Sequence, residues 1–190
     1  MASKIIRSPK SLLRNELRAA LKKISPSLRV RKSRKIITRL LRSRYYRQAQ
    51  NIFTYVATPA EVNTRELIRQ ALRTGKSISV PKVYLGKHRI EAVRIKHPRQ
   101  GLRRGAYGIL EPGRAERMMQ IRPSLLDLVV VPGLGFDRRG RRLGRGAGYF
   151  DRFLRRAKRA KKVALAFREQ LVEKIPVEQH DVLMDAVITD

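Results

Sequence analysis

Arginines and glycines that could hold an anion are crowded into one stretch of this sequence. Five of the residues from 138 to 145 are arginines, and Gly144, Gly146 and Gly148 alternate with the last of these and Ala147. Glycine lets main-chain N–H groups approach an anion closely, and the start of a following helix adds partial positive charge. Asp151 comes in the first turn of that helix, where a carboxylate could hold a divalent cation bound to phosphate oxygens. These residue types predict a cradle for a triphosphate.

Simpler interpretations of the same stretch stay open. Glycines also mark ordinary loops, and Asp151 could be an acid that merely interacts favourably with the helix dipole. The stretch contains no Gly-Lys-Ser/Thr, so it is not a Walker A loop, and its glycines do not directly follow a strand as in a dinucleotide fingerprint. The combination of arginines, glycines and one acid is what favours nucleotide binding.

Acidic residues are scarce, so those in loops after predicted strands are candidate ligand contacts. Glu61 lies in the segment TPAEVNT, Glu169 directly follows a predicted strand, and Asp181 comes next to His180. Loops at the ends of rigid elements often carry binding residues. Each acid could equally be a solvated loop residue paired with a nearby arginine, which contributes little to stability.

A buried strand is predicted directly before the arginine-rich loop, at residues 126–131, because the run is short, apolar and β-branched. Helices are predicted from Pro9 to about residue 24, after Ser8 as N-cap, and from Pro26 to about residue 48. Asn63 and Glu66 suggest a capping box that opens another helix, which Gly75 ends. Further strands are expected at residues 52–56, 77–80 (stopped by Pro81), 90–95 (at an edge), 163–167 and 186–189, and residues 101–122 are expected to be irregular.

This alternation of strands and helices predicts an α/β protein: a three-layer α/β/α sandwich around a mostly parallel sheet. A length of 190 residues suits a single domain over residues 1–190. Ligands bind beyond the carboxyl ends of the strands in such sheets. We therefore expect the loops at residues 56–63, 132–148 and 168–181 to converge at one edge.

The composition is strongly basic, with 45 Lys and Arg against 15 Asp and Glu and a net charge of +30. Such a charge suggests a polyanionic partner, and nucleic acid is one class. Residues 29–47 carry nine basic side chains and residues 152–162 carry seven, but both runs also show helical apolar periodicity. This pattern is typical of solvated helix surfaces, and the sequence contains no nucleic-acid-binding motif.

Other classes of protein are disfavoured. The absence of cysteine excludes disulfides and thiol catalysis and fits a cytoplasmic protein. No apolar run approaches the roughly 20 residues that a membrane span needs, and we expect neither a signal peptide nor a membrane partner. The three histidines, His88, His97 and His180, lack the spacing of zinc ligands.

Five segments of the chain, in order, resemble the 5-formyltetrahydrofolate cyclo-ligase family, whose members are also called 5,10-methenyltetrahydrofolate synthetases. The segments are Lys10 with Leu13-Arg14, Glu61 with Thr64, Gly108 with Glu111-Pro112, LDLVVVPGLGFDRRGRRLGRGAGYFDRFL (126–154) and AFREQLVEKIPVEQHD (166–181). The resemblance covers nearly the whole chain. It implies a fold like that of the ribose-5-phosphate isomerase and CoA-transferase group. It also implies ATP- and Mg²⁺-dependent closure of 5-formyltetrahydrofolate to 5,10-methenyltetrahydrofolate, with release of ADP and phosphate.

The same resemblance implies roles for individual residues. Lys10 and Arg145 would be catalytic through charge stabilisation, and Asp151 and Asp181 would hold magnesium. The ATP-binding set would be Lys10, Arg14, Arg142, Leu143, Gly144, Arg145, Gly146, Ala147, Gly148, Tyr149 and Phe150. The folate-binding set would be Val56, Glu61, Arg145, Gly146, Ala147, Gly148 and Tyr149.

Two positions depart from the family pattern: Phe150 replaces a usual tyrosine, and Ala147 replaces a frequent Gly or Lys. The excess positive charge leads to the hypothesis that the protein prefers polyglutamylated folates, whose tails are polyanionic. We expect a monomer. Two rival hypotheses stay open: a basic nucleic-acid-binding protein on the same fold without the chemistry, and another enzyme on this scaffold that uses ATP or a sugar phosphate.

Overall fold

A seven-stranded sheet forms the centre of the molecule in the computed structural model, which describes residues 8–98, 100–113, 119–176, 178 and 181–190. The strand order is β11-β10-β7-β1-β2-β3-β6. Strands β11, β10, β7, β1 and β2 pair in parallel, and β3 runs antiparallel to both of its neighbours. The strands are β1 (Asn51–Phe53), β2 (Ser77–Tyr84), β3 (Arg89–Ile95), β6 (Gln120–Ile121), β7 (Leu128–Val131), β10 (Lys161–Leu165) and β11 (Ala186–Ile188).

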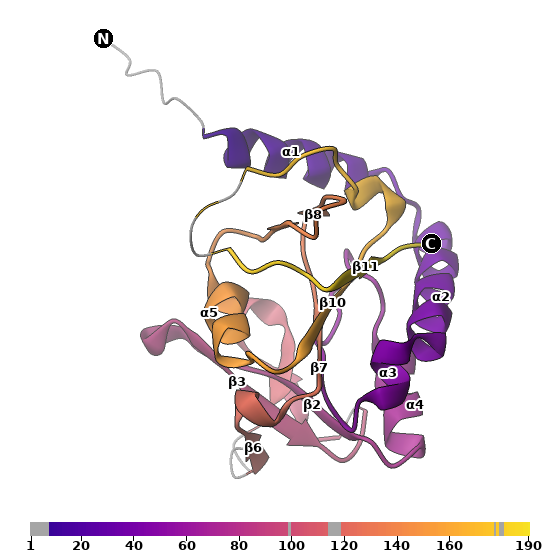
Figure 1. Ribbon diagram of the computed structural model, residues 1–190, viewed down its shortest axis with the longest axis vertical. Coiled ribbons are helices and arrows are strands. Elements are labelled where there is room, and N and C mark those ends of the chain that lie inside the picture. Colours follow the sequence, from indigo (N-terminus) through magenta and orange to yellow (C-terminus); the bar gives the residue numbers. More distant parts are fainter. Residues whose placement is uncertain (1–7, 99, 114–118, 177, 179–180) are drawn as a thin grey trace.

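Helices cover both faces of this sheet (Figure 1). They are α1 (Pro9–Lys22), α2 (Pro26–Arg42), α3 (Arg44–Gln48), α4 (Arg65–Arg73) and α5 (Tyr149–Arg156). Helices α2, α3 and α4 lie on one side and α5 on the other, while α1 runs beside the hairpin that contains β8 (Figure 1). Separate apolar clusters fill the two interfaces, around Leu40 and Leu67 on the first side and around Phe153 and Leu154 on the second. The predicted layers and mostly parallel sheet are confirmed; the likeness to ribose-5-phosphate isomerase stays a prediction.

Short elements fill the connections. Two small hairpins pair β4 (Leu102–Arg104) with β5 (Leu110–Pro112), and β8 (Gly135–Phe136) with β9 (Arg142–Leu143). The 3₁₀ turns are η1 (Leu85–Lys87), η2 (Ala106–Gly108), η4 (Pro123–Leu125) and η5 (Arg168–Gln170). The expectation that residues 101–122 are irregular is therefore wrong for β4, β5 and β6, which are too short to give an alternating pattern.

Helix α1 begins as predicted. The Ser8 hydroxyl accepts a hydrogen bond from the Ser11 N–H, and Pro9 occupies the first helical position. Leu17 and Leu21 are its buried residues.

The single helix predicted from residue 26 to residue 48 is wrong, because the chain breaks at Ser43. This residue has an extended backbone, with φ −72° and ψ 153°. Its hydroxyl donates to the Leu40 carbonyl at 2.7 Å and accepts from the Tyr46 N–H at 3.4 Å. One serine thus ends α2 and caps α3, by competing for backbone groups that a continuous helix would use.

The capping box predicted before α4 is also wrong. Thr64, not Asn63, is the N-cap, and its hydroxyl donates to the Tyr55 carbonyl at 2.7 Å rather than capping the helix. The Asn63 side chain accepts from the Arg65 N–H, and Glu66 pairs with Arg69. The end of the helix is as predicted, since Gly75 adopts a left-handed φ of +73°.

Several strand boundaries, and the position of β3 in the sheet, differ from the predictions. Strand β1 ends at Phe53, and β2 continues through Pro81 to Tyr84. Because β1 pairs only with residues 77–79, one edge of β2 is unpaired beyond them, and a residue without an N–H can continue the strand there. Strand β3 is not at the edge, because β6 pairs with it. The fully buried strand β7 confirms the apolar run.

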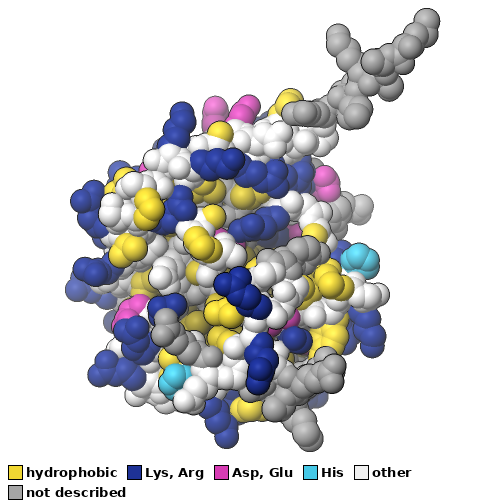
Figure 2. Space-filling view, turned by 180° about the vertical axis from the view of Figure 1, so that it is seen from behind, with side chains coloured by type: hydrophobic (Ala, Val, Ile, Leu, Met, Phe, Trp, Pro, Cys, Tyr) yellow, Lys and Arg dark blue, Asp and Glu magenta, His cyan; other side chains and the backbone are white. Residues whose placement is uncertain are grey.

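The surface carries the charge excess. Figure 2 shows Lys and Arg side chains spread over one whole face, with far fewer Asp and Glu side chains among them. Among the described residues, no helix combines the length and the apolar character that crossing a membrane requires.

Candidate functional site

Loops at the carboxyl ends of β1, β7 and β10 meet at one edge of the sheet, as predicted. The Arg145 Nη2 lies 2.8 Å from a Glu61 carboxylate oxygen, joining the loops after β7 and β1. The Gln170 side chain, just after β10, donates to the Gly133 carbonyl at 2.7 Å. Parallel strands place their carboxyl ends together, and this brings the three loops into contact.

The arginine-rich turn is held by Asp137, whose side chain is 1% exposed. One carboxylate oxygen accepts the Arg139 and Arg141 N–H groups at 2.9 and 3.0 Å. The other accepts the Ile175 N–H at 3.1 Å, from the loop after β10. A single buried carboxylate therefore shapes the β8–β9 hairpin and fixes it to its neighbour.

Two of the glycines that follow this turn adopt backbone conformations that favour glycine. Gly146 and Gly148 have φ of +113° and +65°, which side chains disfavour. Gly148 is the N-cap of α5, and no side-chain bond caps the helix. A Cβ at this position would also lie 2.9 Å from an Arg152 nitrogen. The helix start thus offers main-chain N–H groups to an anion.

Lys10 and Arg14 lie one turn apart on α1 and reach this region. The Lys10 ammonium lies 2.9 Å from an Asp181 oxygen and 3.0 Å from a Glu178 oxygen. Burial alone would lower the pKa of Lys10, but the hydrogen bonds and charges of Asp181 and Glu178 raise it above its usual value. The Arg14 side chain donates to the Gly144 carbonyl at 3.0 Å.

Arg145 is the most exposed of the predicted phosphate-binding cations, with 57% of its side chain accessible. Its partner Glu61 also accepts the N–H and hydroxyl of Thr58, both at 2.9 Å. Burial, and secondarily the Glu61 charge, raise the pKa of the nearby Tyr55 well above 10, so that Tyr55 stays protonated. Glu61 is therefore a fixed acceptor that faces a solvent-exposed cation.

Three residues predicted to bind ATP have buried or packed side chains. The Arg142 side chain is 5% exposed, donates to the Pro132 carbonyl at 3.2 Å and pairs with Asp151. Leu143 packs against Leu17, and Phe150 contacts both apolar clusters of the core. The side chain of Leu143 is buried, and that of Phe150 is partly buried. Tyr149, which was predicted to bind both ligands, has a half-buried ring whose centroid lies 5.4 Å from the Arg152 guanidinium.

The two predicted magnesium ligands lie in this region, and both are paired with cations. Asp151 accepts from Arg142, and Asp181 accepts from Lys10 and from the Glu178 N–H. Within the described ranges, no three metal-ligating side chains form a cluster. Magnesium commonly uses only one or two carboxylates together with substrate phosphates. The donor set therefore fits a metal that arrives with a nucleotide, rather than one caged by the protein.

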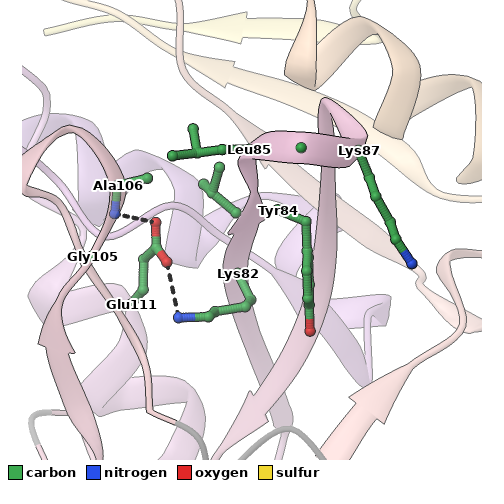
Figure 3. A pocket seen from close by; sticks show the side chains of 9 residues that line it. Lys82, Tyr84, Leu85, Lys87, Gly105, Ala106 and Glu111 are labelled. Atoms are coloured by element: carbon green, nitrogen blue, oxygen red, sulfur yellow. Dashed lines mark hydrogen bonds and ion pairs between the residues drawn. The ribbon is translucent and has the colours of Figure 1, made fainter.

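Two cavities border the β4–β5 hairpin. One, of about 390 Å³, is lined by Val56 and Thr58 beside the Glu61 loop, by Arg29 and Arg65, and by Leu110 of the hairpin. The other, of about 470 Å³, lies between the end of β2 and the Gly105–Glu111 segment (Figure 3). Both are within the size range of small-molecule sites.

A buried ion pair supports the second cavity. Figure 3 shows the Glu111 carboxylate between the Lys82 ammonium, 3.1 Å away, and the Ala106 N–H, also at 3.1 Å. Glu111 is 2% exposed, and a Cβ on Gly105 would lie 2.5 Å from its carboxylate. Gly108, in the same predicted turn, has a left-handed φ of +69°. The Gly-x-x-Glu-Pro segment is therefore a structural turn beside a pocket.

Sequence reasoning missed the supporting residues Asp137, Glu178 and Arg29. Arg29 donates to the Leu21 and Ile24 carbonyls at the end of α1 and to the Pro59 carbonyl in the Glu61 loop. Position in an acid-poor loop could have drawn attention to Asp137. No motif or residue spacing in the sequence indicated a supporting role for Arg29 or Glu178. His180, beside Asp181 in the sequence, lies outside the described residues.

Comparison with known proteins shows which family this chain belongs to. Residues 6–190 match the model of the 5-formyltetrahydrofolate cyclo-ligase family. A 5-formyltetrahydrofolate cyclo-ligase of Mus musculus is 32% identical over 196 residues, covering 99% of this chain and 97% of the relative. The corresponding protein of Escherichia coli K12 is 32% identical over 148 residues, covering 74% of this chain and 78% of the relative.

Solved structures agree with the sequence comparisons. The 5,10-methenyltetrahydrofolate synthetase of Aquifex aeolicus superposes with a TM-score of 0.82 at 32% identity, covering 95% of this chain and 89% of that one. A 5,10-methenyltetrahydrofolate synthetase from Mycoplasma pneumoniae, at 21% identity and a TM-score of 0.74, covers 96% of this chain and 99% of its own; it shows the shared fold.

Proposed function

The chain belongs to the 5-formyltetrahydrofolate cyclo-ligase family, and we propose that the residues gathered at the strand ends carry out its reaction. The reaction is the ATP-dependent closure of 5-formyltetrahydrofolate to 5,10-methenyltetrahydrofolate. The observation that supports this assignment most directly is the Arg145–Glu61 ion pair, because it joins the anion loop to the loop with the predicted folate contacts. The rival hypothesis of a nucleic-acid-binding protein without the chemistry has no support from the relatives.

The nucleotide phosphates lie, in this proposal, between α1 and the start of α5. Lys10, Arg14 and Arg145 supply positive charge, and the glycine-rich loop from Gly144 to Gly148 supplies main-chain N–H groups. Loop residues Arg142 to Phe150 surround the phosphates, with Arg142, Leu143 and Phe150 acting as supports. Phosphoryl transfer needs positioning and charge stabilisation more than covalent help from the protein, and this set supplies both.

Folate occupies the other side of Arg145 in this proposal. Val56 lines the cavity of about 390 Å³, and Thr58, which also lines it, donates to Glu61. Glu61 is a fixed acceptor for N–H groups of the pterin, and residues 145–149 lie between the two ligands. Apolar walls with one fixed carboxylate are typical of a site for a flat heterocycle.

The chemistry starts from a poor leaving group, the oxygen of a formamide. Attack of the formyl oxygen on the γ-phosphorus breaks the bond to ADP and gives a phosphorylated, iminium-like formyl group. The N10 amine then attacks the formyl carbon and loses its proton, and the carbon–oxygen bond breaks as phosphate leaves. Lys10 and Arg145 stabilise the negative charge that develops on the transferring phosphoryl group.

Asp151 and Asp181 are the proposed magnesium ligands. When bound, magnesium neutralises charge on the β- and γ-phosphates. Both carboxylates lie beside proposed phosphate ligands, because Arg142 holds Asp151 and Lys10 holds Asp181. The proposal is tested by titrating magnesium against turnover in the wild type and in Asp151→Asn.

Polyglutamylated folates are the proposed preferred form of the substrate. The basis is the net charge of +30 and, at the 390 Å³ cavity, the lining residues Arg29 and Arg65. Comparing KM for mono- and pentaglutamate substrates at several salt concentrations tests this; equal, salt-independent values would exclude it. That the chain acts as a monomer, forms one domain and works in the cytoplasm are further proposals; a relative from Arabidopsis thaliana is named as mitochondrial.

The decisive experiment follows the absorbance of 5,10-methenyltetrahydrofolate after the protein is mixed with 5-formyltetrahydrofolate, ATP and Mg²⁺. We expect product with the wild type and none when ATP is omitted. A folded wild-type protein that yields no product would refute the proposed function. Product formation that survives in Lys10→Ala and Arg145→Ala would refute the assignment of the site instead.

A further inference from the structure

Four cations of the candidate site are matched in number by four carboxylates, although the chain as a whole carries +30. Arg145 pairs with Glu61, Arg142 pairs with Asp151, and Lys10 pairs with both Asp181 and Glu178. Together with Arg14, bound to the Gly144 carbonyl, these residues make four cations and four carboxylates. Lys10 and Arg145, two of the cations that we assign to the nucleotide phosphates, are thus already paired with carboxylates.

An anion that approaches Lys10 therefore meets an occupied cation. It must displace Asp181 and Glu178, and the displaced carboxylates then face the incoming phosphate as like charges. A phosphate that arrives with a divalent cation avoids this repulsion, because the cation can take the carboxylates while Lys10 takes the phosphate. The contact between Lys10 and its carboxylates is then replaced by a contact between Lys10 and phosphate and another between the carboxylates and the divalent cation, so that every charge still faces one of opposite sign.

We propose that Asp181 and Glu178 are specificity-determining residues that make the site reject polyphosphates lacking a divalent cation. The inference rests on the proposed function, because it takes the α1–α5 region as the phosphate site. The Lys10 pair is the effective one, since its side chain is 12% exposed and that of Asp181 is 18% exposed. Arg145, at 57% exposure, is screened by water and exchanges partners more easily.

Such selectivity would offset the unselective attraction of anions by the positive charge of this chain. A surface with a net charge of +30 attracts every polyanion in solution, and steering of this kind does not discriminate between them. Carboxylates that block the phosphate-binding cations add the repulsive element that specificity requires.

The test measures binding of inorganic tripolyphosphate by calorimetry, with EDTA or with Mg²⁺. We expect the wild type to bind it weakly in EDTA and at least ten-fold more tightly with Mg²⁺. The Glu178→Gln/Asp181→Asn variant should bind metal-free tripolyphosphate at least ten-fold more tightly than the wild type, and magnesium should help it little. If the double variant shows no thermal unfolding transition and is therefore not folded, the same binding measurement is made on Glu178→Gln alone. Glu178 is 52% exposed, and we expect a gain of about three-fold there.

A matched control removes two acids elsewhere. Glu66 pairs with Arg69 on α4, and Asp185 pairs with Lys161 beside β10. The Glu66→Gln/Asp185→Asn variant changes net charge equally, and its affinity for metal-free tripolyphosphate should stay within two-fold of the wild type. An equal gain in the control, or no gain in Glu178→Gln/Asp181→Asn, would overturn the proposal. Because no folate is present, failure of the methenyl assay would count against the proposed function and not against this result.

Discussion

The strand-end site and the helical surface of α2 and α3 differ in whether their basic side chains have acidic partners. At the site, principal basic side chains are paired with carboxylates: Lys10 contacts Asp181, and Arg145 contacts Glu61. Residues 17–60, which include α2 and α3, contain no acidic residue at all. The exposed basic side chains of this surface, here called the bare basic face, are Arg31, Arg34, Lys35, Arg39, Arg42, Arg44 and Arg47.

This comparison shows that the helical surface contributes more to the excess positive charge of the chain than the paired residues of the site do. On α2, Ile36, Ile37 and Leu40 are buried, and the remaining face is free to carry any polar residue. The half-buried Lys32 is the exception on this helix, since it contacts Glu169 and Asp190. On α2 and α3, Lys32 is thus the basic residue with a carboxylate partner among the described contacts, whereas the cations Lys10, Arg142 and Arg145 of the site each have one.

Removing the exposed cation Arg145, or Asp151 in the first turn of α5, tests the site most strongly. We expect Arg145→Ala or Asp151→Ala to lower kcat/KM by at least about 10²–10³-fold, because each removes charge stabilisation during phosphoryl transfer. The methenyl absorbance assay measures this, with thermal unfolding as the control for folding. Near-normal rates in both variants would show that the paired charges are not the catalytic ones.

Removing Asp137 tests the scaffold of the site. Asp137→Ala leaves three main-chain N–H groups without their acceptor and should cost about 2–3 kcal/mol of unfolding free energy. Asp137→Asn, which keeps one acceptor oxygen, should cost less. Denaturant unfolding measures both; an equal cost in the two variants would contradict the role assigned to the carboxylate.

Neutralising the bare basic face should leave catalysis alone. For the variant Arg31→Gln/Lys35→Gln/Arg42→Gln we expect turnover within about two-fold of the wild type and each substitution to alter stability by less than about 0.5 kcal/mol. Non-specific binding to duplex DNA should become weaker and less dependent on salt. A large loss of turnover would break the contrast between the two regions.

The pair between Lys32 and Asp190 should give the smallest effect, visible only through pH. Burial alone would raise the pKa of Asp190, but hydrogen bonds from Lys32 and the Arg168 N–H lower it below its usual value. The stabilisation is therefore present above the ordinary pKa of Asp, about 3.9, and is lost as pH falls through the lowered pKa. Lys32→Gln should flatten the acid limb of thermal stability; an unchanged limb would show that the pair contributes nothing.

Local features of the site could be predicted, and their contacts could not. The buried run before the loop and the position of Asp151 in the first turn of a helix depend on neighbours in the chain. Arg142 was predicted to bind phosphate directly, but it lies buried against Asp151, because the β8–β9 hairpin turns its side chain inward. Likewise, nothing local showed that Ser43 would break a helix whose periodicity continues past it.

The sequence by itself determined the periodic and local properties of this protein: helix faces, the cap of α1, buried strands, and the order in which basic and acidic loops follow the strands. Only the tertiary structure decided which acid meets which base, as in the pairs Lys10–Asp181, 171 residues apart, and Glu61–Arg145, 84 residues apart. The physical reason is that periodicity follows from bonded geometry along the chain. An ion pair depends instead on the distance between charges in space, which the parallel sheet sets by bringing its strand ends together.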